Sequence, residues 1–175
     1  MGMQDVAAAM ERVKTVLERR PDMGLHDDAH ATATWKGGTR IVATHANGKQ
    51  IATDMPQEFS GTGDQVTPGW LFRAGLASCA ATTIAMTAAE RGIELTTLEV
   101  KADSRSDARG FLRMEEPDGS LVAAGPCDLR VTVRIAASNA PAEQLRALVD
   151  EGLGCAPISN AVANANPIAV DVEIA

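Results

Sequence analysis

Cysteine thiols are the most reactive groups in this sequence, and two of the three stand in informative surroundings. Cys79 lies near the middle of a long uncharged segment, and Cys155 lies two residues before Pro157, which opens a short apolar segment. The thiolate is the form of cysteine that attacks electrophiles. In a reducing compartment, a pair of such thiols is redox-active more often than structural. Cys127 follows Gly125-Pro126 and has neither a partner nor a motif.

Position alone does not make Cys79 reactive. Unpaired cysteine is among the most buried residue types, so Cys79 could equally be a small core residue like its alanine neighbours. If Thr67 begins the helix, Cys79 lies about 18 Å along it, beyond the first turn where the helix dipole acts. A reactive Cys79 therefore needs a cation or a hydrogen-bond donor from elsewhere. Cys155 precedes a predicted helix start, where free backbone N–H groups would stabilise a thiolate.

The helix that carries Cys79 is predicted over residues 67–92. Thr67 can cap its start, Pro68 suits the first helical position and Gly92 suits the position after the end. No charged side chain occurs from Ala74 to Ala89, a run shorter than the roughly 18 residues that a membrane span needs. The pattern predicts a helix buried in a core. Small residues over 75–81 would let another backbone approach it closely.

The remaining pattern predicts an α+β domain around that helix. An amphipathic helix over residues 1–21 precedes one domain that covers residues 22–175, and Asn47-Gly48 between alternating runs indicates a hairpin. The other expected elements are a three-stranded antiparallel meander over 30–54, strands over 95–104 and 127–137, an irregular strand over 110–115, helices over 141–151 and 157–165, and a terminal strand over 168–174.

The composition and the N-terminal residues argue against several classes of function. The net charge of −7 argues against nucleic-acid binding, which requires clustered basic residues. The N-terminus has neither a basic start nor an apolar signal core, so we expect a cytoplasmic protein without a membrane segment. His26 and His30, four residues apart beside Asp27 and Asp28, could in principle bind a metal, but no third ligand lies nearby and a solvated connector is the simpler interpretation. We expect no metal and no cofactor.

The segments TPGWLFRAGLASCAATTIAMTAAERGIELTTLEV and GCAPISNAVANANPIAVDVEI, with ARGF between them, resemble the OsmC/Ohr family of osmotically induced and organic hydroperoxide resistance proteins. The resemblance covers roughly residues 30–175. It implies antiparallel sheets wrapped around a long central helix in an intertwined homodimer. It also implies that Cys79 attacks a small organic hydroperoxide, that Cys155 resolves the sulfenic acid as a disulfide, and that a dithiol reductant, lipoyl or a small thiol, restores the pair.

The chain departs from the family in two residues that activate the thiol, a glutamate and a loop arginine, since no arginine occurs between Met55 and Gly69. Peroxidase members carry a glutamate directly after the proline that opens the cysteine helix, and this glutamate orients an arginine that activates the thiol. Gly69 occupies that position here. Arg40 and Arg73 are candidate activating cations, and Glu58 is a candidate replacement carboxylate. An apolar pocket would be bordered by Trp70, Leu71 and Phe72, although these residues could equally serve core or dimer packing.

Two hypotheses follow. The first is a thiol-dependent peroxidase that reduces organic hydroperoxides. The second is a non-catalytic dimer of the same fold that binds a small apolar ligand or a partner, its peroxidase activity weakened or lost. The presence of both Cys79 and Cys155 favours the enzyme, and Gly69 favours the binding protein.

Overall fold

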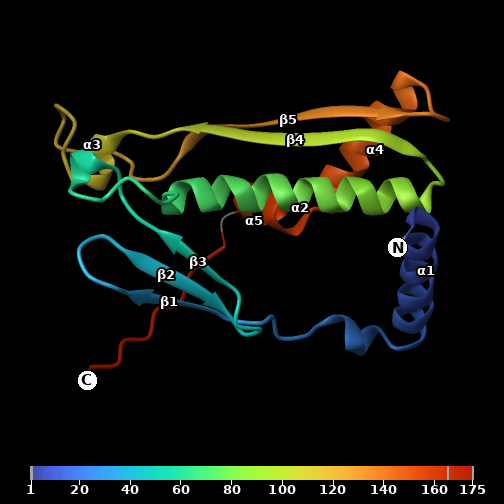
Figure 1. The fold of residues 1–175 in the computed structure, drawn as a ribbon, viewed down its shortest axis with the longest axis horizontal. Helices are drawn as coiled ribbons and strands as arrows, with labels where there is room; N and C mark the ends of the chain where they lie inside the picture. Colours follow the sequence, from blue (N-terminus) through green and yellow to red (C-terminus); the bar gives the residue numbers. More distant parts are fainter. Residues whose placement is uncertain (1, 165, 175) are drawn as a thin grey trace. The chain divides into compact units, whose positions relative to one another are not determined.

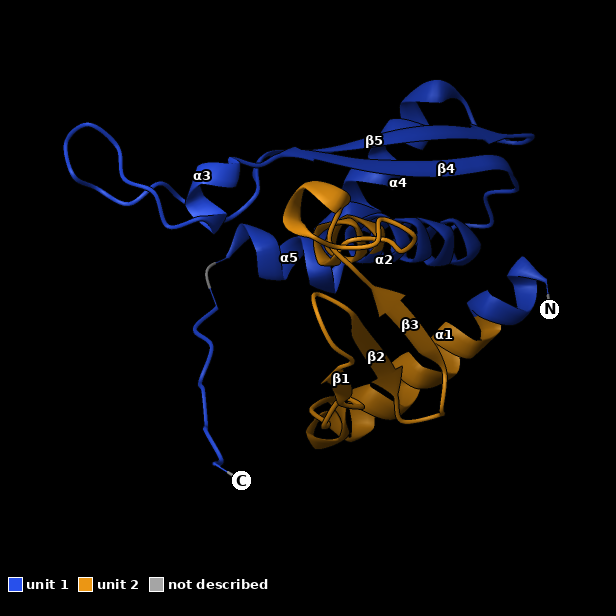
Figure 2. Ribbon diagram, turned by 60° about the vertical axis from the view of Figure 1, so that its left-hand side comes forward, with its two compact units in different colours: residues 1–7, 75–175 blue, residues 8–74 orange. Residues whose placement is uncertain are grey.

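The computed structural model describes residues 2–164 and 166–174 of the chain. It forms two compact units, one of residues 8–74 and one of residues 1–7 with 75–175 (Figure 2). The boundaries between the units fall inside the first helix, α1 (Met3–Arg19), and inside the long helix α2 (Pro68–Glu90). Each unit is described by itself below.

The unit of residues 8–74 contains the predicted meander. Strands β1 (Ala31–Trp35), β2 (Ile41–His45) and β3 (Gln50–Thr53) pair antiparallel in the order β1-β2-β3, which confirms the prediction. Gly48 has a φ of +85° in the β2–β3 turn, the backbone conformation that glycine tolerates best. After β3 the chain makes a 3-10 turn over Gln57–Phe59 and returns to pair Val66 with Thr53 before α2 starts.

The unit of residues 1–7 and 75–175 is built on a two-stranded antiparallel ribbon, β4 (Leu95–Arg105) with β5 (Cys127–Ala137). The ribbon runs beside α2 (Figure 1). A short helix, α3 (Ala108–Phe111), lies between the strands in sequence, and α4 (Ala142–Gly154) and α5 (Pro157–Ala163) follow them. Helices and antiparallel strands in this order make the chain α+β, as predicted.

A small apolar core joins α2, α4 and the ribbon. Ile84 from α2 and Leu148 from α4 are fully buried, and Ala88, Ile93 and Leu145 complete the buried cluster. Half-buried aliphatic side chains of β4 and β5 pack against it. Burying an aliphatic side chain of this size contributes about 1.5–3 kcal/mol. The backbone of α4 approaches α2 so closely at Gly152 that a Cβ there would lie 2.8 Å from the Ile84 Cα.

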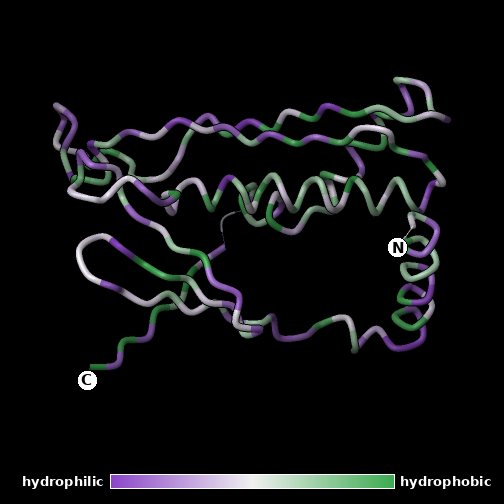
Figure 3. The backbone as a smooth tube through the Cα atoms, viewed as in Figure 1, coloured by the Kyte–Doolittle hydropathy of each residue, from purple (hydrophilic) through white to green (hydrophobic). Residues whose placement is uncertain are grey.

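Both ends of α2 are formed by the predicted residues. Thr67 Oγ1 accepts a hydrogen bond from the Trp70 N–H at 3.2 Å, and Gly92 has a φ of +64° after the last turn. Hydrophobic residues recur along the helix (Figure 3), but only some of its positions are buried: Leu76, Ala80, Ile84, Thr87, Ala88 and Ala89. The helix is long and apolar enough to cross a membrane by length and composition, criteria that core helices also meet.

Two expected strands are absent from the described structure. Residues 110–115 were expected to be extended, but Gly110 and Phe111 belong to α3, whose start is capped by a hydrogen bond from the Arg109 N–H to Asp107 Oδ1. Of the other residues in this range, only Glu115 pairs, with Leu121. Residues 166–174 have no regular structure, and Ile168, Val170, Val172 and Ile174 are 74–90% exposed. A strand requires a neighbour for its backbone groups, and no described segment of the chain supplies one to residues 166–174.

Candidate functional site

The structure brings the two thiol-bearing segments together within the second unit. The backbone N–H of Ile158, at the start of α5, donates a hydrogen bond to Cys79 Sγ on α2, with an N–S distance of 3.5 Å. One turn before Cys79, a Cβ built on Gly75 would lie 3.7 Å from Ile158 Cδ1. The small residues of α2 thus admit the start of α5, as their sequence predicts (Figure 1).

Cys155 lies at the end of α4, three residues before Ile158. It is exposed, and its Sγ–H donates to the Gly152 carbonyl oxygen over 3.4 Å. Ala156, between the two helices, is fully buried and anchors the connection. We expected the start of α5 to stabilise a Cys155 thiolate. The structure instead directs the Ile158 N–H to Cys79, because Cys155 precedes the helix and faces back toward α4.

Cys79 is half-buried, and all three cysteines are free thiols. Besides the Ile158 contact, the Thr83 hydroxyl donates to the Cys79 carbonyl oxygen at 3.2 Å, which fixes the backbone rather than the sulfur. A neutral N–H donor favours a thiolate less than a cation does. These contacts hold Cys79 beside the segment that carries Cys155. They do not include the cation that a reactive Cys79 needs.

A partly buried ion-pair cluster lies in the first unit, around Arg40 just before β2. The guanidinium donates from Nε to Asp54 Oδ2 at 3.2 Å, and from Nη2 to Thr62 Oγ1 at 2.6 Å and Asp64 Oδ1 at 2.5 Å. Its Nη2 also forms an ion pair with Asp54 Oδ2 at 3.1 Å. Hydrogen bonds from Thr62, Gln65 and Arg40 hold the pKa of Asp64 below its ordinary value. Arg40 is thus held in place by Asp54, Thr62 and Asp64.

Asp54 is the most enclosed ionisable group of this cluster, with a side chain only 2% exposed. Its carboxylate accepts hydrogen bonds from Thr39 Oγ1 at 2.5 Å, from the Met55 N–H at 2.8 Å, and from the Thr62 hydroxyl and N–H at 2.7 and 3.2 Å. The hydrogen bonds from Thr39 and Thr62 hold its pKa well below the ordinary range against the opposing effect of burial. Asp54 therefore stays ionised beside Arg40.

Sequence reasoning missed Asp54 and placed the carboxylate elsewhere. Glu58 lies on the exposed 3-10 turn Gln57–Phe59, and among the described residues Arg40 pairs with Asp54 and Asp64 rather than with Glu58. Arg73 is half-buried in the first turns of α2 and makes its own interaction. The sequence does place Asp54 at the end of a predicted alternating strand. A carboxylate that is buried at such a position needs hydrogen-bond partners, and this could have drawn attention to it.

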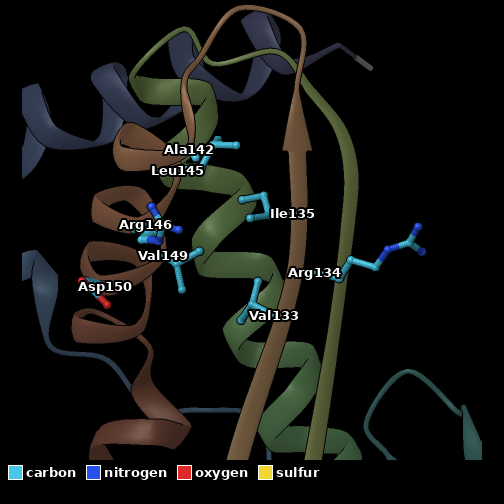
Figure 4. A pocket seen from close by; sticks show the side chains of 8 residues that line it. All are labelled: Val133, Arg134, Ile135, Ala142, Leu145, Arg146, Val149 and Asp150. Atoms are coloured by element: carbon cyan, nitrogen blue, oxygen red, sulfur yellow. The ribbon is translucent and has the colours of Figure 1, made fainter.

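The apolar residues Trp70, Leu71 and Phe72, which were expected to border a pocket, lie at the start of α2. Trp70 is 46% exposed, whereas Leu71 and Phe72 are half-buried. A well-defined hollow lies elsewhere, as an open groove of about 540 Å³ between β5 and α4 (Figure 4). Its walls are apolar, and its charged residues stand at the edge, where Arg134 points away from α4. The lining residues are Val133, Arg134, Ile135, Ala142, Leu145, Arg146, Val149 and Asp150. No thiol contributes to this groove.

The histidine-containing connector is exposed. His26 Nε2 lies 3.7 Å from Asp28 Oδ1. Within residues 2–164 and 166–174, no group of three or more His, Cys, Asp or Glu side chains is placed to hold a metal ion.

Comparison with known proteins identifies the family. The family model described as OsmC-like protein matches residues 61–171, so α1 lies outside the matched region. The OsmC-like protein of Mycoplasma pneumoniae superposes with a TM-score of 0.65 at 17% identity, covering 81% of this chain and 91% of that chain. A search of curated proteins by sequence finds no match at the similarity required.

Two further solved structures have similar folds. The organic hydroperoxide resistance protein OsmC of Legionella pneumophila has a TM-score of 0.56 and 23% identity, over 79% of this chain and 90% of that chain. The organic hydroperoxide resistance protein OhrB of Bacillus subtilis has a TM-score of 0.51 and 23% identity, over 79% of this chain and 93% of that chain. These structures establish the fold, and the family model spans most of the chain. The chain belongs to the OsmC/Ohr family.

Proposed function

We propose that this protein is a thiol-dependent peroxidase that reduces organic hydroperoxides. The observation that carries the proposal is the hydrogen bond from the Ile158 N–H to Cys79 Sγ, because it holds the attacking sulfur against the segment that bears Cys155. Membership of the OsmC/Ohr family and the folds of hydroperoxide resistance proteins in other organisms support the same chemistry.

The reaction begins at Cys79. Its thiolate attacks the terminal oxygen of the hydroperoxide, an S–O bond forms, the O–O bond breaks, and the alkoxide leaves as an alcohol after taking a proton. Cys79 is then a sulfenic acid. The Cys155 thiolate attacks its sulfur, an S–S bond forms and water leaves. A dithiol reductant, a lipoyl group or a small thiol, reduces the disulfide by thiol–disulfide exchange.

The activating cation in this proposal is Arg40 or another arginine, since a guanidinium stays protonated and donates from a rigid planar fork. A cation beside Cys79 would favour the thiolate and the developing alkoxide. The cycle needs a reducing compartment, in line with the cytoplasmic location that the sequence favours. It also operates in a homodimer, in which the exposed apolar residues of the C-terminal segment are covered.

A second candidate function rests on Gly69. A dimer of this fold that keeps both thiols but binds a small apolar ligand or a partner protein would need no activating glutamate. A Cβ added to Gly69 would make ordinary contact with Arg73 Nη1 at 3.7 Å, which is compatible with either function.

Stopped-flow kinetics separates the two candidates. With Cys127→Ser as the common background, cumene hydroperoxide should oxidise Cys79 far faster than it oxidises a free small thiol at the same pH. Cys79→Ser should abolish the fast phase. Cys155→Ser should keep the fast phase and accumulate a sulfenic acid at Cys79 that dimedone traps. A background variant that reacts no faster than the free thiol would leave the binding protein as the better interpretation.

A further inference from the structure

Helix α1 has an apolar face that remains exposed in the single chain. It is one continuous helix over Met3–Arg19, and none of its 17 residues, all of which the structure describes, is buried. Val13 and Val16 are 57% and 46% exposed, and Met23, in the turn that follows the helix, is 48% exposed. An open groove of about 380 Å³ runs along this face within the unit of residues 8–74. Its lining residues are Ala9, Arg12, Val13, Val16, Leu17 and Met23.

The apolar residues of α1 have the spacing of a coiled-coil seam. Successive members of the stripe are three, four, three and four positions apart, the repeat that keeps one side of a helix against a partner helix. They are Met3, Val6, Met10, Val13 and Leu17. Hydrophilic residues lie between them along the helix (Figure 3). The helix offers about two heptads, which suits a contact within a larger assembly better than an isolated coiled coil.

The charges of α1 distinguish between the two directions in which such a helix could pair with itself. Its first half carries Asp5 and Glu11 and no basic residue. Its second half, residues 12–19, carries two arginines and one lysine against a single glutamate. An antiparallel pair places the acidic half of each helix opposite the basic half of the other and also opposes the two helix dipoles. A parallel pair would bring like charges together, so charge complementarity favours the antiparallel pair.

The family assignment leaves α1 without a role. The matched region covers residues 61–171 and therefore begins well after this helix. The thiols of the proposed peroxidase cycle, Cys79 and Cys155, also lie outside it. A contact made by α1 is thus an addition to the OsmC-like part of the chain.

We propose that α1 packs in antiparallel orientation against α1 of a second copy of this chain. The stripe from Met3 to Leu17 of one copy then covers the same stripe of the other. When the two helices overlap along their full length, Val6 of one copy lies opposite the partner's Leu17, and Met10 lies opposite the partner's Val13. The surface is self-complementary, as a two-fold contact between identical chains requires. The inference is independent of hydroperoxide reduction.

Engineered disulfides test both the contact and its direction in the full-length protein. The background carries Cys79→Ser, Cys127→Ser and Cys155→Ser, so that only introduced thiols react. Val6→Cys combined with Leu17→Cys in one chain should form a covalent dimer when oxidised with diamide. The two thiols of a single chain lie about 16 Å apart along the helix, too far to bridge within it. Each single variant should stay monomeric on a non-reducing gel, because antiparallel pairing separates each position from its own copy.

Charge substitutions on two faces of α1 supply the matched control in the double-cysteine protein. Val13→Glu places a carboxylate in the stripe and should lower the yield of covalent dimer about fivefold or more, because the contact would bury an unpaired charge. Ala8→Glu adds the same charge at an exposed position on the opposite side of the helix and should leave the yield unchanged. Val13 is exposed, so the variant should keep its fold, which circular dichroism checks. Val16→Glu replaces it if it does not.

The outcomes separate the contact from its alternatives. A folded double-cysteine protein that gives no covalent dimer would overturn the inference and leave a lipid surface or a different protein as the occupant of the face. A covalent dimer from Leu17→Cys alone would contradict the antiparallel direction. Equal yields from Val13→Glu and Ala8→Glu would mean that the disulfide forms by random collision, which also overturns the inference. Because the background lacks all three native thiols, none of these results bears on the proposed peroxidase function.

Discussion

The Cys79 sulfur receives a hydrogen bond from a backbone N–H that belongs to the segment carrying the second thiol. A backbone donor cannot be lost by side-chain rotation, so the contact holds α5 and Cys79 together as long as the unit stays folded. In the proposed peroxidase cycle, the Cys155 side chain must also turn toward Cys79. The Sγ–H of Cys155 must leave the Gly152 carbonyl oxygen before it can attack a sulfenic acid.

The hydrogen bonds of Asp54 make stability depend on pH. Its pKa in the folded chain lies below the ordinary value of 3.8, so the ionised form contributes stability above about pH 4. That contribution is lost as the pH falls through the folded-state pKa. Urea unfolding at pH 7 and pH 3 should therefore show a smaller pH-dependent loss of stability in Asp54→Asn than in the wild type. An equal loss in both proteins would mean that Asp54 is not ionised in its hydrogen-bonded state.

At the scale of single residues, the sequence identified the thiols Cys79 and Cys155 but not the ion-pair cluster around Arg40. Cys79 and Cys155 were selected because each stood in a recognisable helix context, and Arg40 entered only as a candidate. Asp54 was not predicted as a site residue because its hydrogen bonds join it to residues 8–15 positions away in the sequence, across a strand turn and a loop. No periodicity or motif encodes contacts of that kind, which depend on how the loop after β3 closes.

Helix α4 lies so close to α2 that only glycine fits at one crossing point. A Cβ on Gly152 would lie 2.8 Å from both Cα and Cγ1 of Ile84, well inside contact distance. Gly152→Ala should therefore destabilise the unit by about 1–3 kcal/mol through overpacking. Gly154→Ala, two residues later with nothing within 4 Å of the added atom, is the control. Thermal or urea unfolding measures both, and equal stabilities would contradict the packing described for α2 and α4.

Elements with local signals were predictable and elements without them were not. The caps of α2 and the meander from β1 to β3 follow from Thr67, Gly92 and the Asn47-Gly48 turn, whose preferences act within a few residues. Helix α3 was not predicted because four residues are too few to show the hydrophobic periodicity of a helix. Apolar and other residues alternate in segment 168–174 as they do in a strand. Alternation indicates that one face of a strand could be buried, but it does not supply the neighbouring strand that the backbone needs.

The whole molecule has an apolar surface that the single chain does not cover. The exposed aliphatic residues of the C-terminal segment and the half-exposed sides of α2 are the surfaces that a homodimer would bury. A dimer is also what the OsmC/Ohr resemblance implied from the sequence. An intertwined dimer would cover α2, which is apolar along its length but buried at only some of its positions within the single chain.

Mapping of the oxidised cysteines is the most direct test of the peroxidase function. The protein is treated with one equivalent of cumene hydroperoxide without reductant, quenched in acid and digested for mass spectrometry. A working peroxidase should form a Cys79–Cys155 disulfide with one cumyl alcohol released per disulfide, and a dithiol should reverse it while Cys127 stays reduced. Recovery of Cys79 and Cys155 as unmodified thiols after the hydroperoxide has been offered would contradict the account.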